Sequence, residues 1–129
     1  MATKAIRLDG VTRPWGCFYE LERKEGYVVK KLILFPERRT SLQYHEHRSE
    51  VWTVASGHGV AWHLSPFSDN QPVQETIGPG DIIRVSKNEP HRIENMSSID
   101  QLVIIEVQLG EICDEEDIVR IADDYGRVA

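Results

Sequence analysis

The sequence predicts an all-β protein, either a sandwich or a closed barrel, with one short helix near its end. Nine glycines and six prolines are scattered along 129 residues and divide the chain into short segments. Most of these segments are β-branched, aromatic or alternating, which is typical of strands in an antiparallel fold. Hydrophobic residues make up 40% of the chain, enough to build one core at this length. No repeat or linker divides the sequence, so we expect a single domain over residues 1–129.

The expected strands follow one another between turn signals. Residues 15–22 are rich in aromatic side chains and end at the charged turn 23–26, and residues 27–35 are apolar and stop at Pro36. Residues 101–109 form the most hydrophobic run and predict a buried central strand. The other strand segments are 40–47, 50–55, 60–64, 73–77 and 81–85, with a polar loop expected over 65–72.

Only the segment after Asp114 has a helical pattern. Ile118, Ile121 and Ala122 recur at the i, i+3 and i+4 positions, and the acidic residues 114–116 precede them, near the positive end of a helix dipole. We therefore expect about nine strands and one short C-terminal helix, arranged as a sandwich or a closed barrel.

Charge and cysteine content limit the classes of function. The chain has 21 acidic and 15 basic side chains and a net charge of −6, which argues against a protein that coats nucleic acid. A small anionic ligand is not excluded, because two or three arginines can bind one locally. Cys17 and Cys113 are far apart and form no Cys-x-x-Cys pair, so we expect free thiols in a reducing cytosol. The sequence has neither a signal-peptide pattern nor the ~18 apolar residues of a membrane span, so we expect a soluble, cytoplasmic protein.

The strongest chemical signal is the segment HEHRSE, residues 45–50. On a strand, His45 and His47 point to the same side with their Cβ atoms about 7 Å apart, and both can reach one metal ion. Glu50 can join them only if the chain bends or bulges near Arg48. Gln43 lies on the histidine side of the same segment and is a candidate ligand or a partner of one.

These residues resemble a known family. The pattern His-x-His-x-x-Glu-(x)6-Gly over 45–57, followed by Gly-(x)10-His-(x)3-Asn over 80–95, is similar to the two cupin motifs. The resemblance implies a cupin double-stranded β-helix, a jelly-roll barrel, with one metal inside it. Asn88 stands where the second motif usually has glycine, and asparagine tolerates the left-handed conformation of such a turn. The metal ligands implied by the resemblance are His45, His47, Glu50 and His91. This mixed nitrogen and oxygen set suits a divalent ion, with zinc preferred and Mn, Fe, Co or Ni as alternatives.

Further segments narrow the resemblance. The sequence RPWG at 13–16, the second motif at 91–95 and three segments near the end of the chain resemble the type II mannose-6-phosphate isomerase domain. The similarity covers a core of residues 13–127. That domain is often the carboxy-terminal part of proteins that also carry a mannose-1-phosphate guanylyltransferase. The resemblance implies a stand-alone, metal-dependent isomerase that interconverts mannose 6-phosphate and fructose 6-phosphate.

The implied reaction assigns roles to residues around the metal. Moving a proton between C2 and C1 through a cis-enediol requires stabilisation of negative charge and a base close to the carbon-bound proton. The candidates for this base are Glu50, Lys31, His63 and Glu106. Lys30 and Lys31 are neighbours on one strand, so only one of them can face into the barrel. Arg92 is assigned to both catalysis and substrate binding, and the other substrate-binding candidates are Arg48, Gln43, Arg120 and Arg127.

Two other functions compete with isomerisation. The chain can be a non-catalytic cupin that binds a sugar or another metabolite, or an iron-dependent cupin oxygenase with similar ligands. Arg48 can bind a phosphate or form an ion pair, for example with Glu94. The expected partners are a small sugar phosphate and a second copy of the chain, paired through the amino-terminal edge strand. A separate mannose-1-phosphate guanylyltransferase is a further candidate, whereas nucleic acid and membrane are not expected.

Overall fold

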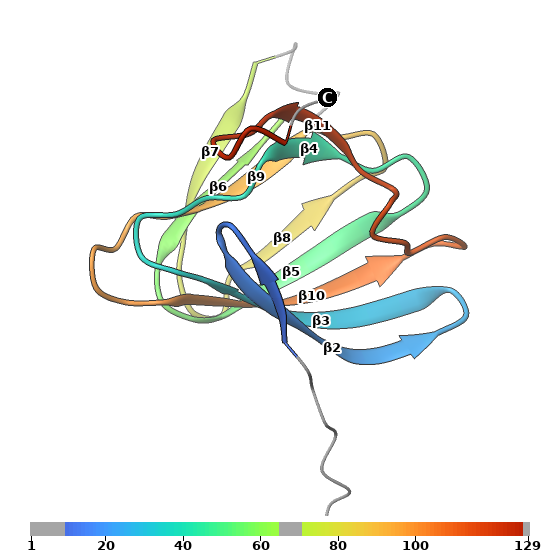
Figure 1. Cartoon of the computed structure of the whole chain (residues 1–129), viewed down its shortest axis with the longest axis horizontal. Coiled ribbons are helices and arrows are strands. Elements are labelled where there is room, and N and C mark those ends of the chain that lie inside the picture. The colour runs from blue at the N-terminus through green and yellow to red at the C-terminus, as the bar shows by residue number, and fades with distance from the viewer. Residues whose placement is uncertain (1–9, 65–70, 128–129) are drawn as a thin grey trace, which may run out of the picture.

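The chain folds into two antiparallel β-sheets that face each other (Figure 1). The structure is a computed structural model and describes residues 10–64 and 71–127. These residues form eleven strands and no helix, which confirms the all-β prediction. One sheet has six strands in the order β1-β2-β3-β10-β5-β8, and the other has five in the order β11-β4-β9-β6-β7.

The longest strands belong to the six-stranded sheet. Its members are β1 (Val11–Arg13), β2 (Gly16–Lys24), β3 (Tyr27–Leu34), β10 (Leu102–Leu109), β5 (Ser49–Ser56) and β8 (Ile82–Val85). The five-stranded sheet consists of β11 (Val119–Ala122), β4 (Leu42–Tyr44), β9 (His91–Asn95), β6 (Gly59–His63) and β7 (Val73–Ile77). The predicted central strand is therefore β10, which lies between β3 and β5.

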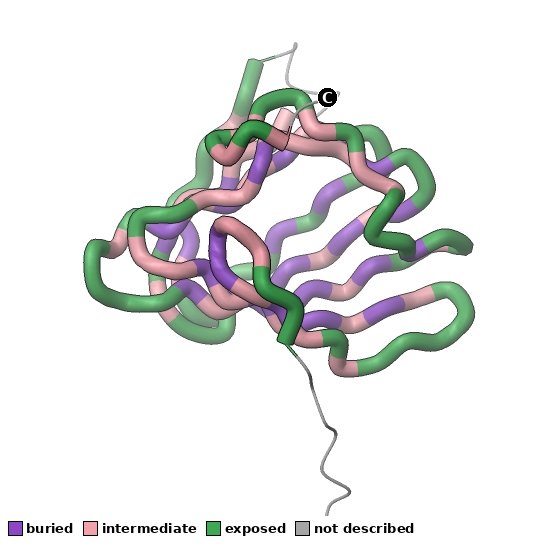
Figure 2. The backbone as a smooth tube through the Cα atoms, in the orientation of Figure 1, coloured by how far each residue is buried: buried purple, intermediate pink, exposed green. Residues whose placement is uncertain are grey.

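The inner face of the six-stranded sheet changes character along its strands. Buried and less buried residues alternate along β3 and β10 (Figure 2). Since successive side chains of a strand point to opposite faces, every second side chain points between the sheets. Toward one end, the paired residues Leu32 and Ile104 belong to the hydrophobic core. One step further along the same face, the paired residues Lys30 and Glu106 are buried but polar. The apolar core thus fills one end of the space between the sheets, and polar side chains line the other.

The predicted C-terminal helix is not seen. Its residues form a turn followed by β11, which pairs antiparallel with β4. The Asp117 amide closes the turn on the Asp114 carbonyl, and the Asp117 carboxylate accepts hydrogen bonds from the backbone amides of Glu46 and His47. These long-range bonds outweigh the local i, i+3, i+4 pattern, and the β-branched residues of the segment suit a strand.

The turn between β5 and β6 requires its glycine. Gly57 lies in the SGHG segment and has a φ of 85°, in the left-handed region. A Cβ at this position would lie 2.3 Å from the carbonyl oxygen of Gln101. The turn therefore passes too close to the neighbouring backbone for any larger residue.

Two further sequence predictions concern the cysteines and one loop. Cys17 and Cys113 are both free thiols, as predicted. Of the loop expected over 65–72, residues 65–70 lie outside the described part of the chain. Within the described part, no helix is long and apolar enough to cross a membrane.

Candidate metal centre

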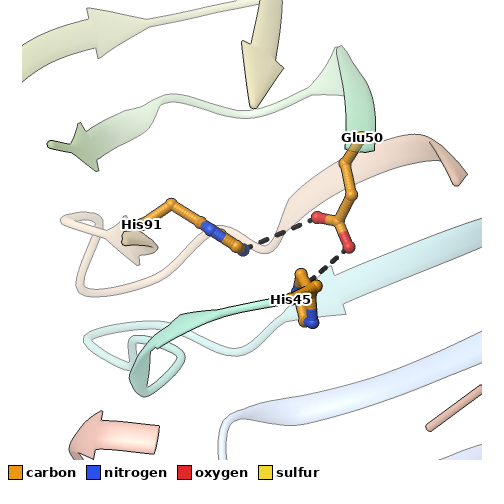
Figure 3. Close-up of side chains that lie close together, drawn as sticks. All are labelled: His45, Glu50 and His91. Carbon is orange, nitrogen blue, oxygen red and sulfur yellow. Dashed lines mark ion pairs between the residues drawn. The ribbon is translucent and has the colours of Figure 1, made fainter. Parts of the chain in front are cut away.

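Three buried side chains meet at the polar end of the space between the sheets (Figure 3). His45 directly follows β4, Glu50 lies in β5 and His91 begins β9. The Nε2 atom of His45 is 3.2 Å from Glu50 Oε2, and the Nε2 atom of His91 is 3.6 Å from Glu50 Oε1. One potential ligand atom from each residue lies within 4.8 Å of the others. The three residues could therefore hold one metal ion.

Backbone carbonyls fix the orientation of both imidazoles. His45 Nδ1 donates to the Asp117 carbonyl at 2.6 Å, and His91 Nδ1 donates to the Glu89 carbonyl at 2.8 Å. Since Nδ1 carries the proton, the lone pair of each ring is on Nε2, which faces Glu50. His91 Nε2 is buried and has no hydrogen-bond partner among the described residues. Metal-binding histidines are commonly held in this way, with the second ring nitrogen bonded to a carbonyl or carboxylate.

Two turns place His45 in this position. The chain leaves β4 after Tyr44 and bends before β5 begins, which confirms the bend predicted near Arg48. Asn88 has a φ of 62°, as expected for a residue that replaces the turn glycine, and its amide donates to the His45 carbonyl at 2.7 Å. The turn of the second motif therefore supports a ligand of the first.

The electrostatics favour the ligand forms of all three side chains. Burial lowers the pKa of His45 to about 4 and also lowers the pKa of His91, so both imidazoles are neutral near pH 7. Burial alone would raise the pKa of Glu50, but the charges that His45, His91 and Arg48 can carry lower it to about 2. Trp52 Nε1 and Arg48 Nε each donate to the Glu50 carboxylate at 3.0 Å. Two neutral imidazoles and one carboxylate form a donor set that suits a divalent transition metal.

His47, the fourth predicted ligand, is not brought into this cluster. It is exposed on the bend between β4 and β5, and its backbone amide bonds the Asp117 carboxylate. The strand alternation that would place His45 and His47 on one side ends at Tyr44. Gln43 does face the pocket beside the cluster, where its Oε1 accepts a hydrogen bond from Ser41 Oγ at 2.6 Å.

Glu50 and His91 of the cluster line a pocket that has a cationic rim. Three half-buried arginines line it, Arg13, Arg120 and Arg127. Arg120 Nε is buried without a hydrogen-bond partner among the described residues, and burial together with the charge of Arg127 lowers the pKa of Arg120. The Arg127 guanidinium donates two hydrogen bonds to the Asp123 carboxylate, at 2.8 and 2.9 Å. Like charges crowded in this way favour the binding of an anion.

The opposite wall of the pocket carries two buried ionisable groups on neighbouring strands, Glu106 and Lys30. Glu106 on β10 is 6% exposed. Its pKa is raised to about 8, mainly by burial and to a smaller extent by the negative charge of Glu50. Gln108 donates to Glu106 Oε1. Lys30, the residue opposite Glu106 on β3, forms an ion pair with Glu115 at the mouth of the pocket.

The structure places the other predicted site residues unequally. Arg48 lines the pocket and pairs with Glu50 rather than with Glu94. Lys31 and Arg92 do not line it, because each follows an inward-facing residue on its strand and so points to the opposite side. His63 also lies outside the pocket lining, and its ring nitrogens face Glu89 at 2.8 Å and Glu75 at 3.3 Å.

Some residues that shape the site gave no clear signal in the sequence. The carbonyls of Asp117 and Glu89 orient the two histidines, and a backbone carbonyl has no side-chain signature. Lys30 was signalled by the adjacent pair of lysines, but the pattern did not show which of the two faces inward. Arg13 belongs to the RPWG segment, yet only the fold brings it to the same rim as Arg120.

Comparisons with known proteins relate most of the chain to one family. Residues 3–123 match the family model described as mannose-6-phosphate isomerase C-terminal. The mannose-1-phosphate guanylyltransferase ManC of Salmonella typhimurium is 35% identical over 118 residues. The alginate biosynthesis protein AlgA of Pseudomonas aeruginosa is 36% identical over 119 residues. Each match covers 92% of this chain but 23% of the relative, so the chain spans about a quarter of the length of these proteins.

Solved structures share the fold. Oxalate decarboxylase from Bacillus subtilis superposes with a TM-score of 0.77 at 14% identity, over 89% of this chain and 30% of the other. The capsular polysaccharide assembling protein CapF from Staphylococcus aureus has a TM-score of 0.73 at 21% identity, over 89% of this chain and 34% of the other. These likenesses confirm the predicted cupin double-stranded β-helix.

Proposed function

Because this chain belongs to the mannose-6-phosphate isomerase C-terminal family, we propose that it is a metal-dependent isomerase of sugar phosphates. Its reaction would interconvert mannose 6-phosphate and fructose 6-phosphate. The observation that carries the proposal is the pair of imidazoles, each oriented by a carbonyl, that meet Glu50 at a pocket that Glu50, His91 and several arginines line. The named relatives are about four times as long as this chain, so it corresponds to only a part of each.

The chain's own residues supply the ligand set. His45, Glu50 and His91 would hold the divalent ion, with zinc preferred. Gln43 lines the same pocket as Glu50 and His91 and would contact a sugar hydroxyl there. A bound divalent ion would act as a Lewis acid that stabilises negative charge on the sugar oxygens. Arg48 stabilises the ionised form of Glu50 through its hydrogen bond, so the carboxylate is ready to bind a cation near neutral pH.

The arginine rim would bind the phosphate group. A phosphate carries close to two negative charges at pH 7 and is bound well by guanidinium groups, which donate in pairs. Arg120 has a buried Nε without a partner and is the first candidate. Arg13 and Arg127 line the same pocket and already bind carboxylates, Glu115 and Asp123, whose place a phosphate oxygen can take. The phosphate would then lie at the mouth and the C1–C2 end of the sugar beside the metal centre.

The test is a coupled assay of fructose 6-phosphate formation from mannose 6-phosphate. The protein is first freed of metal with a chelator and then supplied separately with Zn, Mn, Fe, Co and Ni. We expect no turnover without metal and restored turnover with at least one of these ions. Thermal stabilisation by mannose 6-phosphate without turnover under any of these conditions would contradict the isomerase and favour a non-catalytic sugar-binding cupin.

Two histidine variants test the ligand set directly. His91→Ala removes an Nε2 that faces Glu50, so we expect it to bind no metal after dialysis against a stoichiometric metal buffer. His47→Ala is the matched control, because His47 is exposed and outside the cluster, and we expect it to keep full metal content. Metal analysis and circular dichroism on both variants separate loss of the ion from loss of the fold. Equal metal content in the two variants would refute the assignment.

A further inference from the structure

The proposed isomerisation needs a group that moves a proton between two adjacent carbons. We propose that Glu106 is that group, an inference that rests on the proposed function. Three carboxyl groups line the pocket, Glu50, Glu106 and Glu115, together with the amine of Lys30. Glu106 differs from the other three groups in its hydrogen bonds and ion pairs.

The other candidates are already engaged. Both oxygens of Glu50 are bound, one by Trp52 and one by Arg48, and they face the two histidines. Glu115 lies at the mouth, where it forms ion pairs with Lys30 and Arg13. The same ion pair occupies Lys30, whose Nζ also lies 4.5 Å from the centre of the Phe18 ring. Glu106 has a single hydrogen bond, from Gln108 to Oε1, so its Oε2 has no hydrogen-bond partner among the described residues.

The sheet register places Glu106 on the same pocket wall as Glu50. Glu106 on β10 is directly opposite Trp52 on β5, and Glu50 lies two residues before Trp52 on the same face. The backbones of such diagonal neighbours are about 7–8 Å apart. Glu106 lines the same pocket as Glu50 and His91, so its carboxyl faces the space in which a sugar bound at the metal centre would lie, as a base must.

The neighbour of Glu106 also points to a polar ligand. Gln108 is 1% exposed and lines the pocket, and its Oε1 is buried without a hydrogen-bond partner among the described residues. An unpaired acceptor in such a place is unfavourable unless a ligand supplies a donor. A sugar hydroxyl can do so, and it would bring the adjacent carbon toward Glu106.

The environment of Glu106 suits a group that both takes and returns a proton. Burial and the charge of Glu50 raise its pKa to about 8, against the partly compensating charges of Lys30 and Arg48. A group whose pKa is near the working pH exchanges protons most effectively. This property supports the assignment, which rests on the position of the carboxyl and its uncommitted oxygen.

From aldose to ketose, the Glu106 carboxylate takes the proton from C2 of the open-chain sugar. The electrons of that C–H bond form the C1=C2 double bond, the C1=O1 π electrons move to O1, and O1 takes a proton from water. The cis-enediol then loses the O2 proton to water, C2=O2 forms, and C1 takes the proton back from the Glu106 carboxyl. The net change is one proton moved from C2 to C1 and one exchanged between O2 and O1.

The experiment compares Glu106→Gln with Glu106→Asp and with the matched control Glu20→Gln. Glu20 on β2 is paired with Lys30 on β3, on the side away from Glu106, but it is exposed and does not line the pocket. For each metal-loaded protein, turnover and the incorporation of deuterium from D2O into the sugar are measured. Metal content and the thermal shift caused by mannose 6-phosphate provide two readouts that do not depend on turnover.

We expect Glu106→Gln to keep its metal and its thermal shift with mannose 6-phosphate, while turnover and deuterium incorporation fall at least 100-fold, the usual scale for loss of a general base. Glu106→Asp should recover part of the rate, and Glu20→Gln should match the wild type. If the wild type turns over and Glu106→Gln stays within threefold of it, the role of Glu106 is refuted and the isomerase function stands. If the wild type neither turns over nor incorporates deuterium with any metal, the proposed function fails and this inference fails with it.

Discussion

The buried carboxyl of Glu106 should make the stability of the metal-free protein depend on pH. Its pKa is about 8 in the folded protein and 4.5 for an ordinary glutamate, so the folded state binds more protons than the unfolded state between these values. The free energy of unfolding therefore falls as the pH rises through this window. Below pH 4.5 the carboxyl is neutral in both states, and above pH 8 the full cost of the buried charge is present.

The size of the effect follows from the slope of linkage, about 1.4 kcal/mol per pH unit for each proton. Between pH 6 and pH 9 the unfolded carboxyl is ionised throughout, whereas the folded carboxyl stays protonated up to about pH 8. The folded state therefore holds one extra proton over about two pH units of this interval. The wild type should thus lose about 3 kcal/mol more stability over this interval than Glu106→Gln, whose amide cannot ionise. For a chain of this length the loss corresponds to roughly 10 °C in Tm.

Urea or thermal unfolding of the two metal-free proteins at pH 6 and pH 9 measures the difference. Lys30, Glu50 and Arg48, the charged groups that act on Glu106, are present in both proteins, so their own titration cancels to first order. Glu20→Gln controls for removal of an exposed carboxylate and should follow the wild type. Identical pH dependence in wild type and Glu106→Gln would refute the argument, because it would mean that Glu106 is solvated or paired in the folded protein.

Three further predictions concern the arginine rim of the pocket, the bend after β4 and the turn at Gly57. Arg120→Gln should raise KM for mannose 6-phosphate about tenfold with little change in kcat, since its unpaired Nε is expected to bind the phosphate; an unchanged KM in the coupled assay would remove Arg120 from the phosphate site. Asp117→Asn weakens the hydrogen bonds that the Glu46 and His47 amides donate to this side chain and should reduce metal affinity about 10-fold or more in a competition titration. An unchanged affinity would show that the Asp117 carbonyl alone orients His45. Gly57→Ala should lower the free energy of unfolding by at least about 2 kcal/mol in urea, because the new Cβ meets a backbone carbonyl. Gly26→Ala, also at positive φ but in open space, should lower it by only about 1 kcal/mol, and equal losses would contradict the close approach at Gly57.

The fold was predictable because turn signals separate segments that are rich in β-branched, aromatic and apolar residues. These runs are a property of the local sequence, and they identified the segments that form β3 and β10, the latter as a buried central strand. The helix expected after Asp114 was wrong for a related reason, since its pattern covers few residues and the competing bonds reach Glu46 and His47, about seventy residues away in the sequence. Short periodic segments yield to such tertiary contacts.

The candidate site was predictable where it depends on the spacing of residues in the two motifs. It was not predictable where it depends on the side of a strand to which a side chain points. The spacing of the motifs led to His45, Glu50 and His91, which the structure brings together. Strand parity then failed at His47, because the chain bends after Tyr44. Parity also could not choose between Lys30 and its neighbour, because the choice depends on which side of the strand faces the other sheet.

The carbonyl of Asp117 has a consequence for the order in which the metal centre is made. In chain order the three side chains that can bind the ion are complete once His91 has been synthesised, but the group that fixes the ring of His45 comes later, in the segment before β11. A growing chain therefore has all three donors before the ring of His45 is oriented, and an ion captured at that stage would be held loosely and would exchange readily. Selection among ions of different preferred geometry would then occur late, when β11 pairs with β4 and closes the turn.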